Sequence, residues 1–142
     1  MHPNSLKCYN ELQEAKILGK RQLEVFKQIL ETPDRTDREI TELLNEEDPN
    51  YARPRRRDLE KLGIIEASGD RICTVSHKTA TTWRKKNYDL DKVKIQKDKL
   101  NQKTSLYWAN KIVETEKELI RHKVKYFNAM AREQKQTTLG EY

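Results

Sequence analysis

The chain has 142 residues, of which 35% are hydrophobic and 37% are charged. This length suits one domain with an extended arm and is too short for two large cores. The mean hydropathy of −1.05 predicts that part of the chain lacks a deep core, and we place that part at the C-terminus. Lys and Arg outnumber Asp and Glu by 29 to 23, giving a net charge of +6, which favours a polyanionic partner.

The charges are also distributed unevenly along the chain. Residues 34–48 hold seven acidic side chains against two arginines, whereas residues 71–103 hold ten Lys or Arg against three Asp. A folded molecule with this sequence should therefore be electrically asymmetric.

The sequence lacks the cysteine motifs of zinc-binding and disulfide-stabilised proteins and the apolar segments of membrane proteins. Cys8 and Cys73 are far apart and belong to no Cys-x-x-Cys motif, so we expect free thiols in a reducing compartment rather than a zinc site or a disulfide framework. No segment approaches the ~18 to 20 apolar residues that span a bilayer, and the N-terminus lacks the apolar core of a signal peptide. We expect no membrane association and a cytoplasmic, nucleoid-associated location, in the host cytoplasm if the protein is viral.

Catalytic motifs are missing as well. The sequence has no Gly-rich phosphate loop, no Ser/His/Asp order and no metal-ligand spacing. Its four glycines leave little material for an active-site loop. We therefore expect a protein that is not an enzyme, with no cofactor and no bound metal.

Hydrophobic periodicity predicts two helices at the start of the chain. The first is capped by Asn4 or Ser5, carries apolar residues at helical spacing and is interrupted near Gly19. The second covers residues 20–31 and is stopped by the Thr-Pro-Asp sequence that follows it. Their apolar faces should pack on each other.

A capping box marks the start of a short third helix, because Thr36 is followed three residues later by Glu39. The apolar stripe of this helix consists of Ile40, Leu43 and Leu44. After a turn, residues 51–62 predict a fourth helix that ends at Gly63. Pro54 must lie in its first turn, because a proline deeper in a helix removes a hydrogen bond.

Three β-rich runs follow the fourth helix. They cover residues 64–67, 72–75 and 80–83, and turn sequences at residues 68–70 and 76–79 separate them. We interpret them as a three-stranded sheet whose last hairpin projects as a wing. The predicted fold is mainly α with a small β-wing, which is the element order of a winged helix-turn-helix domain.

That order has a mechanical meaning, because the last helix of such a domain enters the DNA major groove while the hairpin reaches the adjacent backbone. With the leucines of the fourth helix facing inward, a rotation of 100° per residue places its polar residues outward. The residues on the outward face are Asn50, Arg53, Arg57 and Lys61, with Arg56 on a flank. The planar guanidinium groups of Arg53 and Arg57 suit guanine, whereas Arg56 and Lys61 suit phosphates.

Basic residues in both elements support this interpretation. Four arginines within residues 53–57 repel one another without carboxylates among them, which favours a neutralising anion over a merely solvated helix face. The wing residues expected to contact the sugar-phosphate backbone are His77 and Lys78 at the tip and Arg84, Lys85 and Lys86 at the exit. For His77, an exposed loop residue without such a contact is the simpler alternative.

Residues 50–66, 71–80 and the pair Trp83-Arg84 resemble the winged-helix domain of small proteins common in phages, prophages and other mobile elements. The resemblance covers residues 5–84. It rests on three features: the Pro-Arg pair inside the predicted fourth helix, the Leu-Gly before the first strand and the basic wing. His77 stands where many members have glycine at the wing turn. The resemblance implies DNA binding through the fold.

Residues 90–133 contain neither proline nor glycine and predict a long amphipathic helix. Its apolar residues form one seven-residue repeat of Leu106, Val113, Ile120 and Phe127 beside a second ladder of Ile112, Leu119 and Tyr126. Glu116 and Lys123 fall where a strict coiled coil requires apolar side chains. The pattern is therefore compatible with a homodimer seam, with an open bundle and with an arm docked on its own domain.

The end of the chain resembles a second motif. Gln136, Leu139 and Tyr142 match the Gln-x-x-aliphatic-x-x-aromatic peptide by which replication and repair proteins, notably archaeal ones, bind a sliding clamp. The second aromatic residue of that motif is missing. A disordered tail without this role is the alternative.

These observations divide the chain into a winged helix-turn-helix domain at residues 1–86, a long helix at 87–133 and a flexible tail at 134–142. The expected function is binding of double-stranded DNA by a transcriptional or replication regulator of viral or mobile-element type, dimeric through its long helix. The alternative is an accessory or adaptor protein of a replication complex that binds a sliding clamp through its tail.

Overall fold

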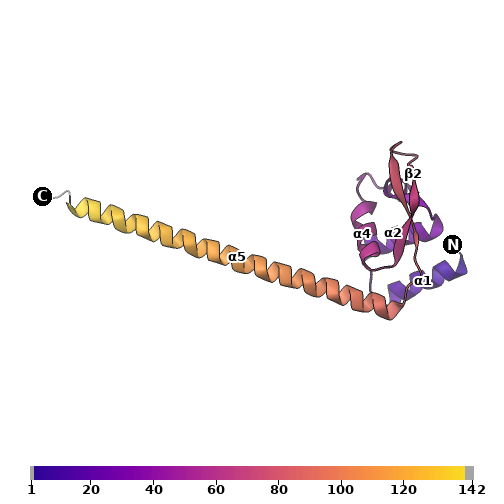
Figure 1. The fold of residues 1–142 in the computed structure, drawn as a ribbon, viewed down its shortest axis with the longest axis horizontal. Helices are drawn as coiled ribbons and strands as arrows, with labels where there is room; N and C mark the ends of the chain where they lie inside the picture. The colour runs from indigo at the N-terminus through magenta and orange to yellow at the C-terminus, as the bar shows by residue number, and fades with distance from the viewer. Residues whose placement is uncertain (1, 140–142) are drawn as a thin grey trace. The chain divides into compact units, whose positions relative to one another are not determined.

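The computed structural model describes the backbone of residues 2–139 and the side chains of residues 2–135. The protein is mainly helical, with a small three-stranded antiparallel sheet and a long C-terminal helix (Figure 1). It divides into two compact units, Met1–Asp98 and Lys99–Tyr142, which we call the N-terminal unit and the C-terminal unit.

Helices α1 and α2 begin the N-terminal unit. α1 (Pro3–Glu14) starts earlier than predicted, since His2 is its N-cap and the proline occupies the first turn, where a missing N–H costs nothing. It also ends sooner. Lys16 adopts a left-handed φ of +52°, and the N–H of Ile17 donates to the carbonyl of Leu12 at 3.4 Å, which closes the helix in a Schellman motif. α2 (Lys20–Glu31) has the predicted bounds.

Helices α3 and α4 follow, and their ends obey local signals. The capping box of α3 (Asp37–Leu43) is confirmed, because the Glu39 N–H donates to Thr36 Oγ1 and the Thr36 N–H donates to Glu39 Oε2. Leu43 was expected to face inward but is 47% exposed. α4 (Ala52–Lys61) holds its proline in the first turn and ends at Gly63, whose φ is +74°.

The sheet differs from the prediction in two ways. Its strands are β1 (Arg35–Thr36), β2 (Ile65–Ile72) and β3 (Thr79–Lys85), all antiparallel in the order β1-β3-β2. β2 joins the predicted strand at 64–67 to Ile72, because the Ser-Gly-Asp sequence between them forms a β-bulge rather than a turn. The rest of the predicted strand at 72–75 lies in the connection to β3. The third strand is the two-residue β1, which the sequence had placed in a connection.

Thr82 of β3 stabilises the bulge. Its hydroxyl lies 2.8 Å from Ser68 Oγ and donates to the carbonyl of Gly69 at 3.1 Å. Gly69 has a φ of +153°, a backbone conformation that side chains rarely adopt. Hydrogen bonds from a facing strand thus hold together a segment whose sequence is typical of a turn.

The core of the N-terminal unit includes the first turns of α5 (Leu90–Leu139). Its largest fully buried side chains come from α1, α2, α3, α4 and the start of β2, and they include Leu12, Phe26, Ile29, Ile40, Leu59, Ile64 and Ile65. Val93 of α5 is 2% exposed, and Tyr88 just before it donates to the carbonyl of Cys8 at 3.2 Å. The unit therefore extends to residue 98 rather than to 86.

The C-terminal unit consists of the rest of α5, which continues beyond the expected end at residue 133. Every side chain described between residues 101 and 135 is exposed. Large apolar residues are among them, including Leu106, Ile112, Val113, Leu119, Ile120 and Phe127. No helix in the described part of the chain is both long enough and apolar enough to cross a membrane.

Candidate nucleic-acid interface

Helix α4 is fixed to the rest of the N-terminal unit by its inner side. Leu59 is fully buried, and the Asp58 carboxylate accepts a hydrogen bond from Gln22 of α2 at 2.9 Å. At the start of the helix, the N–H of Ala52 donates to Thr41 Oγ1 of α3 at 3.2 Å. Neighbouring helices therefore set the rotation of α4 about its own axis.

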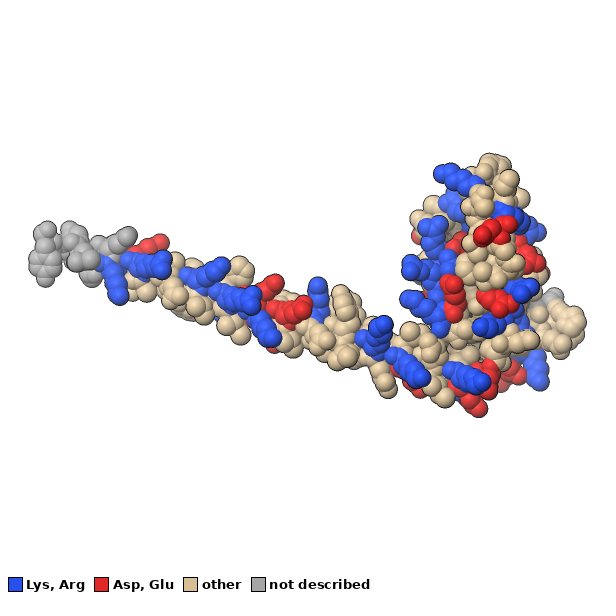
Figure 2. All heavy atoms as spheres, viewed as in Figure 1, with Lys and Arg blue, Asp and Glu red and all other residues tan. Residues whose placement is uncertain are grey.

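The opposite side of α4 faces solvent, as predicted. The residues expected on this face, which are Asn50, Arg53, Arg57 and Lys61, are all exposed. The Arg57 guanidinium makes no hydrogen bond or ion pair with any residue that the structure describes. Figure 2 shows Lys and Arg side chains gathered along the edge of the unit formed by α4.

The prediction that the arginines of α4 have no carboxylates near them is wrong for Arg56. Its guanidinium donates to both carboxylate oxygens of Asp37, at 3.0 and 2.8 Å, and to Glu60 at 2.8 Å. It also stacks 4.0 Å from the centre of the Trp83 ring, and its side chain is only 11% exposed. Burial lowers the pKa of Arg56, but the hydrogen bonds that it donates to Asp37 outweigh burial and raise it. Arg56 thus joins α3, α4 and β3 rather than facing outward.

A groove of about 590 Å³ lies between the start of α4 and the β2–β3 hairpin. Its lining brings together residues from α3, α4 and β3 and from the turns before α4 and β3, among them Arg38, Asn50, Arg53, Lys78, Thr79 and Thr81. Arg38 was not predicted as a binding residue, because it lies in the most acidic stretch of the chain. Arg53 retains 61% exposure and its Nε lies 3.9 Å from an oxygen of Asp37, which leaves most of its guanidinium open to solvent.

The turn of the hairpin is tight although it contains no glycine. His77 adopts a left-handed φ of +54°, and its N–H donates to the carbonyl of Cys73 at 2.9 Å. The N–H of Cys73 in turn donates to the carbonyl of Lys78 at 2.9 Å. The side chains of His77 and Lys78 are consequently both exposed at the turn.

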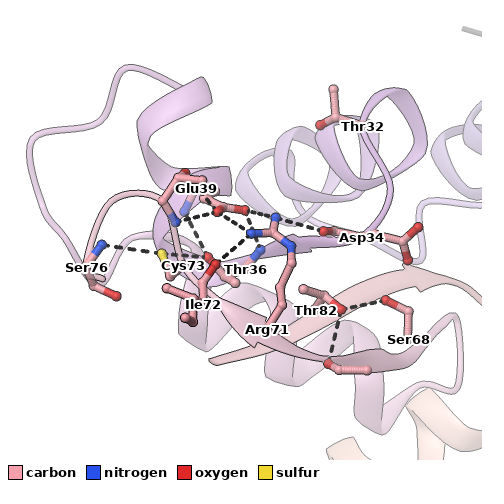
Figure 3. A network of polar contacts seen from close by, with 12 residues as sticks. Thr32, Asp34, Thr36, Glu39, Ser68, Arg71, Ile72, Cys73, Ser76 and Thr82 are labelled. Atoms are coloured by element: carbon pink, nitrogen blue, oxygen red, sulfur yellow. Dashed lines mark hydrogen bonds and ion pairs between the residues drawn. The ribbon is translucent and has the colours of Figure 1, made fainter. Parts of the chain in front are cut away.

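A buried carboxylate fixes the base of this hairpin (Figure 3). Glu39 of α3 is 3% exposed, and it accepts hydrogen bonds from the Arg71 guanidinium at 2.8 Å, from the N–H and hydroxyl of Thr74 at 2.9 Å and from the N–H of Thr36 at 3.1 Å. Burial raises its pKa, but these hydrogen bonds outweigh burial and lower the pKa from 4.5 to about 2. Glu39 is therefore charged at neutral pH and joins the start of α3 to the hairpin.

The sequence had assigned Glu39 only to the capping box. Its second oxygen has partners 32 and 35 residues away in the chain, so local spacing could not reveal them. The one available signal was Arg71, a basic residue next to a β-rich run. Because Glu39 holds the hairpin against α3, it positions the turn that carries Lys78.

The remaining predicted contacts are not in the groove. Lys85 is half-buried and its Nζ lies 3.0 Å from Cys8 Sγ of α1, so it faces the interior. Arg84 forms an ion pair with Glu66 on the neighbouring strand at 2.9 Å. Lys61 and Lys86 line a separate hollow of about 670 Å³ at the end of α4. The basic residues predicted at the wing exit therefore lie on surfaces other than the groove.

The clamp-binding residues predicted from the sequence, which are Gln136, Leu139 and Tyr142, have side chains outside the described residues. In comparisons with protein-family models, curated proteins and solved structures, no match to this chain was found. A function can therefore be inferred only from the geometry of the groove and from the charges around it.

Proposed function

We propose that the N-terminal unit is a winged helix-turn-helix domain that binds duplex DNA, with α4 as the recognition helix and the β2–β3 hairpin as the wing. The observation that carries this proposal is that Arg53 of α4 and Lys78 of the hairpin line the same open groove, with Arg57 unpaired on the same helix. A helix with such a face fits the major groove, while a neighbouring hairpin reaches phosphates.

The roles of the side chains follow from their chemistry. Arg53 and Arg57 can each donate two parallel hydrogen bonds to O6 and N7 of guanine, which makes them the base-reading candidates. Lys78, and Arg38 in the same groove, supply charge for phosphates. Arg56 is a positioning residue, because its donors are used by Asp37 and Glu60. We assign the protein to regulation by binding rather than to catalysis, as a transcriptional or replication regulator of viral or mobile-element type.

The test is selection of a preferred duplex followed by measurement of affinity for that duplex and for single-base variants. Arg57→Ala should weaken binding to the preferred duplex by about 1 to 3 kcal/mol and relax the preference at one base position. Arg121→Ala is the matched control, because this arginine is exposed on α5 and should leave base preference unchanged. An Arg57→Ala protein with unchanged affinity and preference would exclude α4 as the reading helix.

We further propose that the C-terminal unit mediates self-association. Its apolar side chains are 40–65% exposed, and no second element of the unit covers them. A long helix in water gains most of its stability from packing of its apolar side, so this side requires a partner. Sedimentation equilibrium of the full chain at micromolar concentration measures the association directly.

A further inference from the structure

The apolar side of the C-terminal unit has two charges of opposite sign at its centre. At 100° per residue, the large apolar side chains between residues 105 and 131, apart from Tyr107, cover a stripe of roughly 160° on α5. Within that stripe the only charged residues are Glu116 and Lys123. All other charged side chains of this segment lie on the remaining surface of the helix.

Both charges are isolated from other polar groups of their own helix. The neighbours of Glu116 three and four positions away are Ile112, Val113, Leu119 and Ile120, and those of Lys123 are Leu119, Ile120, Tyr126 and Phe127. Neither charge forms an ion pair with any described residue. Seven residues of helix separate them by roughly 10 Å, so one copy cannot pair them with each other.

Covering the stripe also buries these two charges. A buried charge without a partner of opposite sign costs several kcal/mol, so a compatible surface must present a cation to Glu116 and an anion to Lys123. It must present them along an otherwise apolar strip, with the spacing of two helical turns. A second α5 has these properties when it runs in the opposite direction.

We propose that α5 pairs with α5 of a second copy in antiparallel orientation, about a twofold axis between Leu119 and Ile120. In this register Glu116 faces Lys123 of the second copy, and Lys123 faces its Glu116. A parallel, in-register pair would instead place Glu116 against Glu116 and Lys123 against Lys123. Two attractive contacts replace two repulsive ones, and they select the antiparallel orientation.

The same register also pairs the apolar residues by size. Ile112 lies opposite Phe127, and Val113 lies opposite Tyr126, so these two aliphatic residues each meet an aromatic one. Ala109 lies opposite Met130, which places a small side chain against a large flexible one. The proposal deepens the self-association proposed above and does not depend on DNA binding.

Charge reversal tests the register in the full-length protein. Glu116→Lys or Lys123→Glu alone turns both attractive contacts into repulsive ones, so the dissociation constant of the dimer should rise at least about tenfold. The double variant, with both reversals, restores opposite charges and should return to within about threefold of wild type. In a parallel pair every one of these variants only exchanges one repulsion for another. Sedimentation equilibrium without DNA measures the constants.

Matched controls lie on the opposite face of the same helix. Glu118→Lys and Lys125→Glu change the net charge by the same amounts as the test variants, and both residues lie outside the stripe. They should leave the dissociation constant unchanged. A loss of association in these controls equal to that in the test variants would assign the effect to net charge and overturn the register.

Cross-linking provides an independent readout. A mixture of Ala109→Cys and Met130→Cys proteins under a mild thiol oxidant should give a disulfide-linked species that contains one copy of each. Ala109→Cys alone should form no more linked dimer than the wild type, which contains the same two native cysteines. Linked Ala109→Cys homodimers would overturn the antiparallel orientation.

The outcomes separate the two proposals. A wild-type chain that is monomeric at about 100 μM would exclude self-association and the register together. A dimer whose association is insensitive to both single reversals would exclude the antiparallel register alone. Neither result bears on DNA binding, which is measured separately.

Discussion

The two units of the protein treat their apolar residues in opposite ways. In the N-terminal unit, Phe26, Leu59 and Ile64 are fully buried, and Schellman motifs close α1, α3 and α4. In the C-terminal unit, Ile120 and Phe127 are 60% and 65% exposed. The first unit buries its apolar side chains within one chain, whereas the second leaves its apolar side chains exposed.

The charges show the same contrast. Arg56 and Arg71 of the N-terminal unit are paired with the carboxylates of Asp37 and Glu39, so only selected cations are left for a ligand. Glu116 and Lys123 lie inside an apolar stripe without such partners. Charge pairing within a chain fixes a fold, and charges left in an apolar face indicate what must cover that face.

The largest expected effect concerns the C-terminal unit. Val113→Asp combined with Ile120→Asp places two carboxylates in the stripe and should abolish dimers at micromolar concentration, because burying them without partners costs several kcal/mol. Asn110→Asp with Asn128→Asp adds the same charge outside the stripe, beside its edge, and should leave the dimer intact. Sedimentation measures both. Persistence of the dimer in the first variant would move the contact to another surface.

The next effect concerns the stability of the N-terminal unit. The Glu39 pKa is about 2, well below its ordinary 4.5, so its charged form stabilises the fold by about 3 kcal/mol. This contribution is complete above pH 4.5 and is lost as the pH falls towards 2. Glu39→Gln should therefore be less stable than wild type at pH 7, and the difference should shrink below pH 4.5.

Urea unfolding followed at several pH values measures this difference. Glu60→Gln is a suitable control, because its carboxylate also pairs with an arginine but is 49% exposed, where an ion pair contributes little. A Glu39→Gln difference that stays constant from pH 7 to pH 3 would show that the residue acts through packing rather than through its charge.

The sequence predicted those parts of the fold that depend on neighbours in the chain. The bounds of α2, the Thr36–Glu39 capping box and the left-handed Gly63 are all confirmed. Each depends on residues within one or two turns. The two-residue β1 was missed because only its pairing with β3 defines it, and the bulge beside Gly69 was predicted as a turn because Thr82, which stabilises it, is distant in sequence.

The candidate site shows the same division. The outward face of α4 could be predicted from helical geometry, and Arg53 and Arg57 are exposed there. Arg56 could not be assigned, because its partner Asp37 lies 19 residues earlier and Trp83 lies on a distant strand. Lys85 was likewise placed at the wing exit, whereas it lies against Cys8, 77 residues away. Long-range contacts decide which basic residues are available to a ligand.

A smaller effect separates base reading from charge on the proposed DNA surface. Lys78→Ala should weaken binding to all duplexes alike and reduce the slope of log affinity against log salt concentration by about one, because a phosphate contact releases roughly one counterion. Fluorescence anisotropy at four or more salt concentrations measures the slope. Lys27→Ala is the control, since this exposed lysine of α2 pairs with Glu31. A change of base preference in Lys78→Ala would assign the hairpin to base reading instead.

The smallest expected effect concerns the last residues, whose match to a clamp-binding peptide comes from the sequence alone. Leu139 and Tyr142 are three residues apart, so one helical turn would place both on one side, as insertion into an apolar pocket requires. Ordering a short peptide costs free energy, so a peptide of residues 135–142 should bind a sliding clamp with a dissociation constant on the order of micromolar. Calorimetric titration against a peptide with Leu139→Ala and Tyr142→Ala measures this. Equal heats from both peptides at high micromolar concentration would remove the clamp as a partner, and the C-terminal unit would then have self-association as its proposed role.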